Sequence, residues 1–238
     1  MFPLLQEPET PLSDLRDRFA AHPRSLLNRC PGVIVVDKPA GEATSHDIVR
    51  LYRKKTGVRQ MGHAGTLDPM ASGALLLLLG KATRLFGDCQ AWSKTYRAGF
   101  RLGFRTDTQD ITGTPLPPFD PSLQVSANEV ERVLTAFRGD IWQTPPMFSA
   151  IKINGRPLHE LARAGQVVRR EPRPARVERL ALCDFDKMEG ALEMTVGSGF
   201  YVRTLIDDMG QALGCGAVMT ALRRMSVGPF GLGDATVW

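Results

Sequence analysis

The segment GHAGTLDPMASG (62–73) and the leucine run LLLLL (75–79) behind it give the first indication of the fold. A short apolar run bounded by glycines predicts a strand that is buried on both faces. In front of it, three glycines, a proline and small residues surround one histidine, His63, and one aspartate, Asp68. Such a permissive backbone suits a tight active-site loop, yet Asp-Pro is also an ordinary turn dipeptide. The residues alone leave a functional role for Asp68 open.

Strand and helix patterns alternate irregularly on either side of this segment. A β-branched run (32–36) predicts another buried strand. Two capping boxes (44–47 and 126–129) predict the first turns of two helices, which Gly57 and Gly139 are expected to end. Without a strict strand–helix–strand repetition, this order predicts an α+β fold. Further strands are expected at 96–102, 176–185 and 192–196, and a further helix at 202–213.

The composition predicts one main globular body, since the chain has 238 residues and 43% apolar content. No window approaches about 18 consecutive apolar residues and the N-terminus lacks the features of a secretory signal, so we expect a cytoplasmic protein without membrane contact. Residues 1–30 show no sustained periodicity and are expected to form an N-terminal extension. Neither a metal site nor a disulfide framework is expected from the spacing of the cysteines, which are Cys30, Cys89, Cys183 and Cys215.

Positive charge is concentrated in one segment. The chain has a formal net charge of +5, which is compatible with a polyanionic partner. Residues 146–179 contain eight cationic side chains against three glutamates, and so carry as much net charge as the whole chain. A run of charge is usually a solvated face, so a flexible, non-specific patch remains an alternative to a binding site.

Several motifs, in the same order, resemble the TruB family of tRNA pseudouridine synthases. The resemblance begins with GVIVVDKP (32–39) and GHAGTLDP (62–69) and covers about residues 31–238. It implies the family's fold, a mixed, largely antiparallel sheet flanked by helices with a central catalytic cleft. It also implies one catalytic domain with an RNA-gripping insertion around 146–179, whereas the small C-terminal PUA domain of many members is not expected. The other motifs are GKATR (80–84), KTYR (94–97), LGFRTDT (102–108), PPMFSAIK (145–152), GFYVRTL (199–205) and LRR (222–224).

The resemblance implies an isomerisation of uridine to pseudouridine in the T-loop of tRNA, at position 55. In this reaction the N1–C1′ bond of the nucleotide breaks, the base rotates inside the pocket, and a C5–C1′ bond forms. No cofactor is implied, and the sequence contains neither a dinucleotide fingerprint nor a Walker-type loop. Asp68 corresponds to the essential carboxylate of the family. A nucleophile at the sugar, a nucleophile at the base and a charge stabiliser all remain open as its role.

The same resemblance assigns roles to further residues. Arg203 corresponds to the arginine that pairs with the catalytic aspartate and orients it. Tyr96 corresponds to the tyrosine that stacks on the target base and is a candidate to take a proton late in the reaction. His63 corresponds to the residue that occupies the space vacated by the extruded base. Pocket or RNA contacts are implied for Tyr201, Leu222, Lys38, Lys152, Arg169 and Arg170.

The T-stem-loop of tRNA is the expected partner of a monomeric chain that requires no protein partner. Two other classes of function remain open. A non-catalytic tRNA-binding or tRNA-folding module would keep the basic segment without the reaction, although the presence of Asp68, Tyr96 and Arg203 together argues against a lost activity. A glycosidase acting on a small nucleoside would need a second carboxylate at a suitable separation, which the sequence does not nominate.

Overall fold

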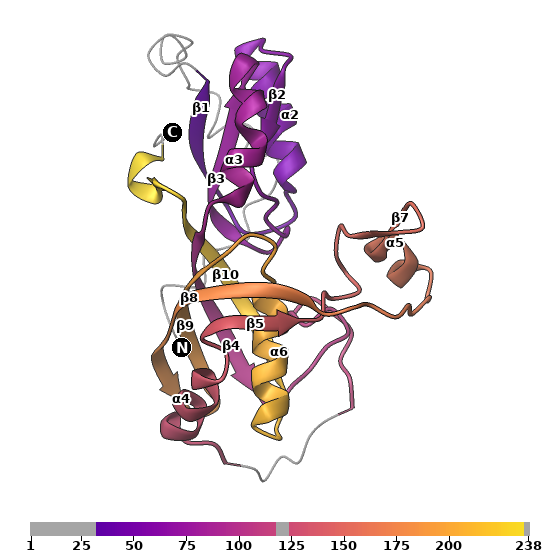
Figure 1. The fold of residues 1–238 in the computed structure, drawn as a ribbon, viewed down its shortest axis with the longest axis vertical. Helices are drawn as coiled ribbons and strands as arrows, with labels where there is room; N and C mark the ends of the chain where they lie inside the picture. The colour runs from indigo at the N-terminus through magenta and orange to yellow at the C-terminus, as the bar shows by residue number, and fades with distance from the viewer. Residues whose placement is uncertain (1–31, 118–123, 236–238) are drawn as a thin grey trace. The chain divides into compact units, whose positions relative to one another are not determined.

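The computed structural model describes residues 32–117 and 124–235 (Figure 1). The expected N-terminal extension (1–30) lies outside the described residues. Among the helices of the described residues, none is long and apolar enough to span a membrane.

The chain divides into two compact units. Among the described residues, unit 1 comprises residues 32–97 and 222–235, and unit 2 comprises residues 98–117 and 124–221. The chain passes from one unit to the other within two strands, β4 (Lys94–Leu102) and β10 (Ala217–Val227). Unit 1 therefore contains the start of β4 and the end of β10, and unit 2 contains the end of β4 and the start of β10.

Unit 1 is built around β3 (Ser72–Leu79), whose residues are all buried. Both β1 (Val33–Lys38) and β2 (Met61–His63) pair with β3 antiparallel, whereas β10 pairs with it in parallel. The other elements of unit 1 are α2 (Ser45–Thr56), the 3₁₀ helix η2 (Gly80–Leu85), α3 (Phe86–Ala91), β11 (Phe230–Gly231) and the 3₁₀ helix η3 (Leu232–Asp234).

Local sequence explains how two of these elements are held. At the start of β3, Gly73 has a φ of +105°, and a Cβ atom there would lie 2.2 Å from the carbonyl oxygen of Arg224 on β10. Only glycine allows the two strands to approach so closely. Helix α2 begins at the predicted capping box, in which Thr44 and Asp47 exchange both hydrogen bonds, and it ends at Gly57 in the left-handed conformation.

In unit 2 the strand order is β10–β4–β9–β8–β5. The pairings of β8 (Arg173–Asp186) with β9 (Glu189–Val196) and with β5 (Gly139–Gln143) are antiparallel. Helix α4 (Ala127–Thr135) contacts both β8 and α6 (Val202–Ala212). Between β5 and β8 the chain leaves this sheet, and residues 144–172 are called the insertion below. It contains the hairpin of β6 (Lys152–Ile153) and β7 (Arg156–Pro157), followed by α5 (Leu158–Arg163) (Figure 1).

These elements confirm the predicted α+β fold with a mixed, largely antiparallel sheet. The pairs β1–β3, β2–β3, β5–β8 and β8–β9 are antiparallel, whereas β3 and β10 pair in parallel. Each strand and helix expected from the sequence is present, with ends that differ by a few residues, as helix and strand ends commonly do.

One predicted helix end is wrong. Gly139 is expected from the sequence to end the second capped helix, but α4 ends at Thr135 and Ala136 is its helical C-cap. The next residues form a turn in which the N–H of Phe137 donates to the carbonyl of Leu134. Gly139 instead begins β5, because the strand that follows pairs with β8 from that residue onward.

The predicted limits of the insertion (146–179) also change. Residues 173–179 belong to β8, where Val177 is buried between exposed neighbours in the alternation of a half-buried strand. Arg173, Arg176 and Arg179 are therefore sheet residues, and the four other arginines of the basic segment lie in the insertion itself.

Candidate active site

The loop that carries Asp68 connects β2 to β3 in unit 1. Its residues Ala64, Leu67 and Ala71 are buried and anchor it in the protein, while Asp68 is partly exposed. The N–H of Ala71 donates to the carbonyl of Asp68 across a tight turn, at 3.0 Å. Ser45 of α2 fixes the preceding residue, because its hydroxyl accepts from the N–H of Leu67 at 2.9 Å and donates to the Leu67 carbonyl at 3.1 Å. The carboxylate thus stands on a short, rigid turn.

Lys38, at the end of β1, holds the other side of this turn. Its side chain has 0% exposure, and its ammonium donates to the carbonyls of Pro39 at 2.9 Å, Pro69 at 2.8 Å and Ala71 at 2.8 Å. Burial lowers the pKa of Lys38 to about 8, an effect that the charge of nearby Asp68 opposes and that of Arg224 reinforces. The sequence predicts a substrate contact for Lys38, but its three N–H groups are used inside the protein. A positioning role for the Asp68 turn fits this geometry better.

Two further buried cations lie beneath the loop. Arg224, on β10, is 1% exposed and donates from Nε to the carbonyl of Ala74 at 2.7 Å and from Nη2 to that of Gly65 at 3.0 Å. Lys94, on β4, donates to the carbonyls of Gln90 and Trp92. Burial, followed by the charge of Arg224, lowers the pKa of Lys94 to about 8. The loop therefore rests on a positively charged floor, which favours the approach of a phosphate.

Unit 1 also contains three residues predicted to contact the target nucleotide. His63 is half-buried at the end of β2, where burial and then the charge of Arg224 lower its pKa, so the ring is neutral at pH 7. Tyr96 is half-buried on β4, and Leu222 is 8% exposed on β10. A neutral imidazole and a phenol with partly exposed rings can stack against bases, whereas Leu222 offers chiefly packing.

In unit 2, Arg203 lies in the first turn of α6 and is held from three sides. It is 6% exposed, and its guanidinium donates to the carbonyls of Thr108 at 2.9 Å and Phe148 at 3.1 Å. Its Nε lies 3.9 Å from a carboxylate oxygen of Asp110. These contacts fix the plane of the guanidinium, as a residue that must orient a carboxylate requires. Asp68 and Arg203 belong to different units, and their pairing stays a prediction.

The loop around Arg203 is itself braced against α6. Gln109 has a φ of 66°, and its side-chain amide donates to Asp207 at 3.2 Å and accepts from the hydroxyl of Thr204 at 3.0 Å. Arg105 forms a two-pronged ion pair with the same Asp207, at 2.6 and 2.9 Å. Because Gln109 stands between Thr108 and Asp110, this network fixes two of the three groups that hold Arg203.

The start of α6 is fixed to β5. The backbone N–H of Tyr201 donates to Oε1 of Gln143 at 2.8 Å, and Nε2 of Gln143 donates back to the Tyr201 carbonyl at 2.9 Å. Gln143 is 4% exposed, so this reciprocal pair is shielded from water. Tyr201 therefore has a fixed backbone position two residues before Arg203.

The predicted RNA-binding residues of the insertion differ in their surroundings. Lys152 and Arg169 are exposed, and Arg169 pairs with Glu171, which is also exposed, at 3.0 Å. Arg170 is half-buried, and it donates to the carbonyl of Pro145 at 3.0 Å, which ties the end of the insertion to its beginning. Exposed ion pairs contribute little to stability, so their cations remain available to phosphates.

Sequence reasoning missed the supporting residues of both units. Ser45, Lys94, Arg105, Gln109 and Arg224 receive no individual role from the motifs, although three of them lie within motif segments. Charged residues are normally exposed, so a sequence pattern gives no sign that one is buried against main-chain carbonyls. Within residues 32–117 and 124–235, no group of three or more His, Cys, Asp or Glu side chains could hold a metal ion.

Comparison with known proteins gives consistent matches along the chain. The family model described as TruB family pseudouridylate synthase (N terminal domain) matches residues 53–202, and the one described as tRNA pseudouridylate synthase B C-terminal domain matches residues 203–238. A protein of Opitutus terrae named tRNA pseudouridine synthase B is 44% identical over 90% of this chain and 86% of its own length. A protein of the same name from Fusobacterium nucleatum is 44% identical over 84% of this chain and 69% of its own length.

Solved structures show the same relationship at lower identity. The chain is 31% identical to one from a Cbf5–Nop10–Gar1 complex, with a TM-score of 0.67 over 89% of this chain and 53% of that chain. It is 27% identical to one from an H/ACA RNP bound to a substrate RNA containing 2′-deoxyuridine, with a TM-score of 0.62 over 97% of this chain and 55% of that one. This chain thus spans about half the length of these two solved chains.

Proposed function

The chain belongs to the TruB family of pseudouridylate synthases, and we propose that it converts the uridine at position 55, in the T-loop of tRNA, to pseudouridine with Asp68 as its essential carboxylate. The observation that carries this proposal is the Asp68 turn. A partly exposed carboxylate stands on a loop that Ser45 and Lys38 fix and that lies above buried cations. This turn coincides with the family motif at residues 62–69.

The reaction requires one carboxylate beside the sugar and no external reagent. Its N1–C1′ bond breaks, the uracil rotates, and C5 bonds to C1′, while C5 loses a proton and N1 gains one. Atoms and electrons therefore balance without a cofactor. Asp68 serves this reaction either by covalent attack or by stabilising the positive charge that develops at the sugar. Both routes need a carboxylate that is held in a fixed place, and the hydrogen bonds of Ser45 and Lys38 hold the Asp68 turn.

The other site residues divide into those that act on the base and those that hold the carboxylate. We assign Arg203 to pairing with Asp68, because three internal contacts already fix its guanidinium. Tyr96 provides a stacking wall for the target base, and His63 stabilises the space that the base vacates. Tyr201 and Leu222 complete the pocket in this proposal, and Lys38 positions the Asp68 turn.

The substrate is the T-stem-loop of tRNA, which the insertion contacts through Lys152, Arg169 and Arg170. Extruding a stacked base costs a few kcal/mol, and phosphate contacts are a source of binding free energy that can offset this cost. We further propose that the chain works as a monomer, without a protein partner, in the cytoplasm where tRNA is found. In this proposal, residues 31–238 form the catalytic domain.

The proposal is tested with purified protein and an unmodified tRNA transcript, followed by site-resolved mapping of pseudouridine. We expect product at the T-loop uridine with wild type and none with Asp68→Asn, which keeps the shape of the side chain and removes its charge. Asp88→Asn, an exposed aspartate of the same unit, is the matched control and should retain activity. Tight tRNA binding without product would favour the binding or folding module, and product from free uridine would favour a nucleoside-directed enzyme.

A further inference from the structure

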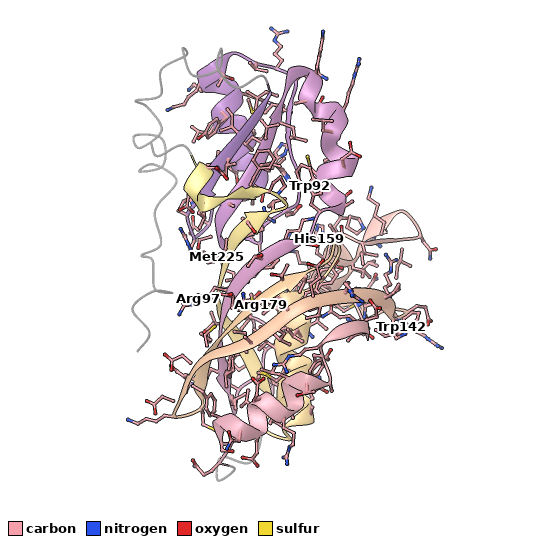
Figure 2. All side chains as sticks on the ribbon, turned by 60° about the vertical axis from the view of Figure 1, so that its left-hand side comes forward. Trp92, Arg97, Trp142, His159, Arg179 and Met225 are labelled. Atoms are coloured by element: carbon pink, nitrogen blue, oxygen red, sulfur yellow. The ribbon has the colours of Figure 1, made fainter. Side chains whose placement is uncertain are left out.

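We propose that Trp142 and Pro174 form a platform on which a base of the substrate RNA stacks, a proposal that rests on the function proposed above. The side chain of Trp142 is 72% exposed on β5 (Figure 2). Tryptophan is enriched at binding surfaces, because its ring offers a large apolar face together with a polar N–H group. None of the motifs that define the family resemblance contains this residue.

The strand register places a flat apolar pair beside a cation. Trp142 lies opposite Pro174 of β8, and Asp140 lies opposite Arg176, one step further along the same face. Directly opposed side chains of antiparallel strands are about 4.5–5.5 Å apart at Cβ, so the indole and the proline ring are neighbours. Pro174 and Arg176 are exposed as well. The face thus offers a base-sized surface with a guanidinium at its side.

The opposite face of β5 makes this platform rigid. Side chains alternate along a strand, so Gln143 points away from the side that carries Trp142. Its amide forms the reciprocal pair with the Tyr201 backbone at 2.8 and 2.9 Å. A base that stacks on Trp142 would therefore be held at a fixed position relative to the start of α6, where Tyr201 and Arg203 lie.

The platform also stands where the insertion leaves and rejoins the sheet. Gln143 is the last residue of β5, Arg173 is the first of β8, and the two are paired. Trp142 and Pro174 form the next pair inward. RNA that is held by the exposed cations of the insertion would reach this pair at the root of the insertion.

The chemistry of the face favours RNA over a protein partner. One tryptophan and one proline are too little apolar surface for the core of a specific protein interface, which buries about 800 Å² on each side. A nucleotide needs only one aromatic face and one cation for its phosphate. Arg176 is available for the latter, because its ion pair with Asp140 at 2.8 Å joins two exposed side chains and such pairs contribute little to stability.

Binding of a synthetic T-stem-loop RNA tests the platform. Stacking of a base on an aromatic side chain is strong enough for removal of the ring to change affinity about tenfold or more. We therefore expect Trp142→Ala to raise the Kd about tenfold and Trp142→Phe, which keeps an aromatic face, to raise it less than about threefold. Ile111→Ala removes an exposed apolar side chain of the same unit, 43% exposed, and should leave the Kd unchanged.

Tryptophan fluorescence gives a readout that a purely structural role would not move. The chain has three tryptophans, Trp92, Trp142 and Trp238, and Trp92 packs against Phe230 with ring centroids 5.8 Å apart. Titration with the RNA should quench the emission of the exposed Trp142, and the quench should be lost in Trp142→Phe. Thermal unfolding of each variant shows whether the fold is intact.

Each outcome decides one question. Equal affinity of Trp142→Ala and Ile111→Ala would overturn the platform, as would equal weakening by Ala and Phe together with earlier thermal unfolding. A change in self-association of Trp142→Ala, with RNA affinity intact, would assign the face to a second copy of the chain and also overturn it. Wild type that forms pseudouridine in any of these cases keeps the proposed function. RNA-dependent quenching without product from wild type would instead remove the proposed reaction and keep the platform.

Discussion

Unit 1 and the insertion of unit 2 both use cationic side chains, but in opposite surroundings. In unit 1, Lys38 and Arg224 are buried and donate to main-chain carbonyls around the Asp68 turn. In the insertion and on the adjoining strand, Arg169 and Arg176 are exposed and pair with exposed carboxylates. The difference teaches that burial separates a cation that fixes a loop through its carbonyls from one whose charge is accessible to a phosphate.

The physical reason lies in the cost of removing a charge from water. A buried ammonium or guanidinium is tolerated only when fixed polar groups satisfy its donors, so each of these side chains also fixes the carbonyls that it contacts. An exposed ion pair keeps its hydration and contributes only about 0–1 kcal/mol. Its cation can exchange a carboxylate for a phosphate at little cost, which suits reversible binding of RNA.

The largest expected effect comes from removing a buried cation. Lys38→Met leaves the carbonyls of Pro39, Pro69 and Ala71 without their donor. Each unsatisfied buried acceptor costs about 1–3 kcal/mol, so the free energy of unfolding should fall by about 3 kcal/mol or more. Urea denaturation followed by circular dichroism measures this change. Lys54→Met, on the exposed face of α2, is the control and should stay within about 0.5 kcal/mol of wild type.

The pH dependence of stability sharpens the same comparison. Burial lowers the pKa of Lys38 and of Lys94 to about 8, whereas an unfolded lysine titrates near about 10.4. Between these values the unfolded chain binds more protons, so stability rises with pH, by at most about 1.4 kcal/mol per pH unit for each lysine. Urea denaturation at several pH values from 8 to 10 should show a steeper rise for wild type than for Lys94→Met. Parallel curves would contradict the lowered pKa of Lys94.

Much of this fold could be predicted from sequence because its elements have local signals. The leucine run of β3 and the capping box of α2 predict their elements without reference to the rest of the chain. The end of α4 could not be predicted from Gly139, since the pairing of β5 with β8 decides where that glycine lies. Non-local pairing overrides a local stop signal in such a case.

The candidate site was predictable only as far as its motifs extend. Asp68 and Arg203 are nominated by the resemblance, whereas the burial of Lys38 could not be predicted, because a sequence pattern gives no sign that a charged residue is buried. Gln109 and Arg224 were missed for a related reason. Their hydrogen-bond partners, Asp207 and Gly65, lie about 100 residues or more away along the chain, and sequence periodicity carries no information at that separation.

An intermediate effect, on kcat, is expected from Gln109, which fixes groups that hold the buried Arg203. Gln109→Gly relieves a backbone strain of about 1–2 kcal/mol and removes two hydrogen bonds worth about 1 kcal/mol each. The free energy of unfolding should therefore change by no more than about 1 kcal/mol. The kcat should still fall by up to about tenfold, with KM unchanged, because the groups that hold Arg203 become less fixed.

The matched control for this brace is Gln211→Ala. Gln211 donates to the same Asp207 at 2.9 Å but does not adjoin the residues that hold Arg203. Its loss should leave kcat near the wild-type value. Equal losses in the two variants would mean that Asp207, rather than the loop at Gln109, controls the arginine.

The smallest effect on stability, and the largest on RNA affinity, is expected from arginines of the insertion and of the adjoining start of β8. Exchanging Arg169, Arg170 and Arg173 for Ser should change the free energy of unfolding by about 1 kcal/mol or less, since one main-chain contact is lost and the rest are exposed. The KM for tRNA should rise, and the slope of log Kd against log salt should decrease by about 0.7–0.9 for each arginine that contacts a phosphate. The control is a triple exchange for Ser of exposed cations outside the insertion, at Arg101, Arg132 and Lys187. If both triple variants lose affinity and salt dependence alike, general charge rather than the insertion binds the RNA, and the contrast between buried and exposed cations would hold for stability alone.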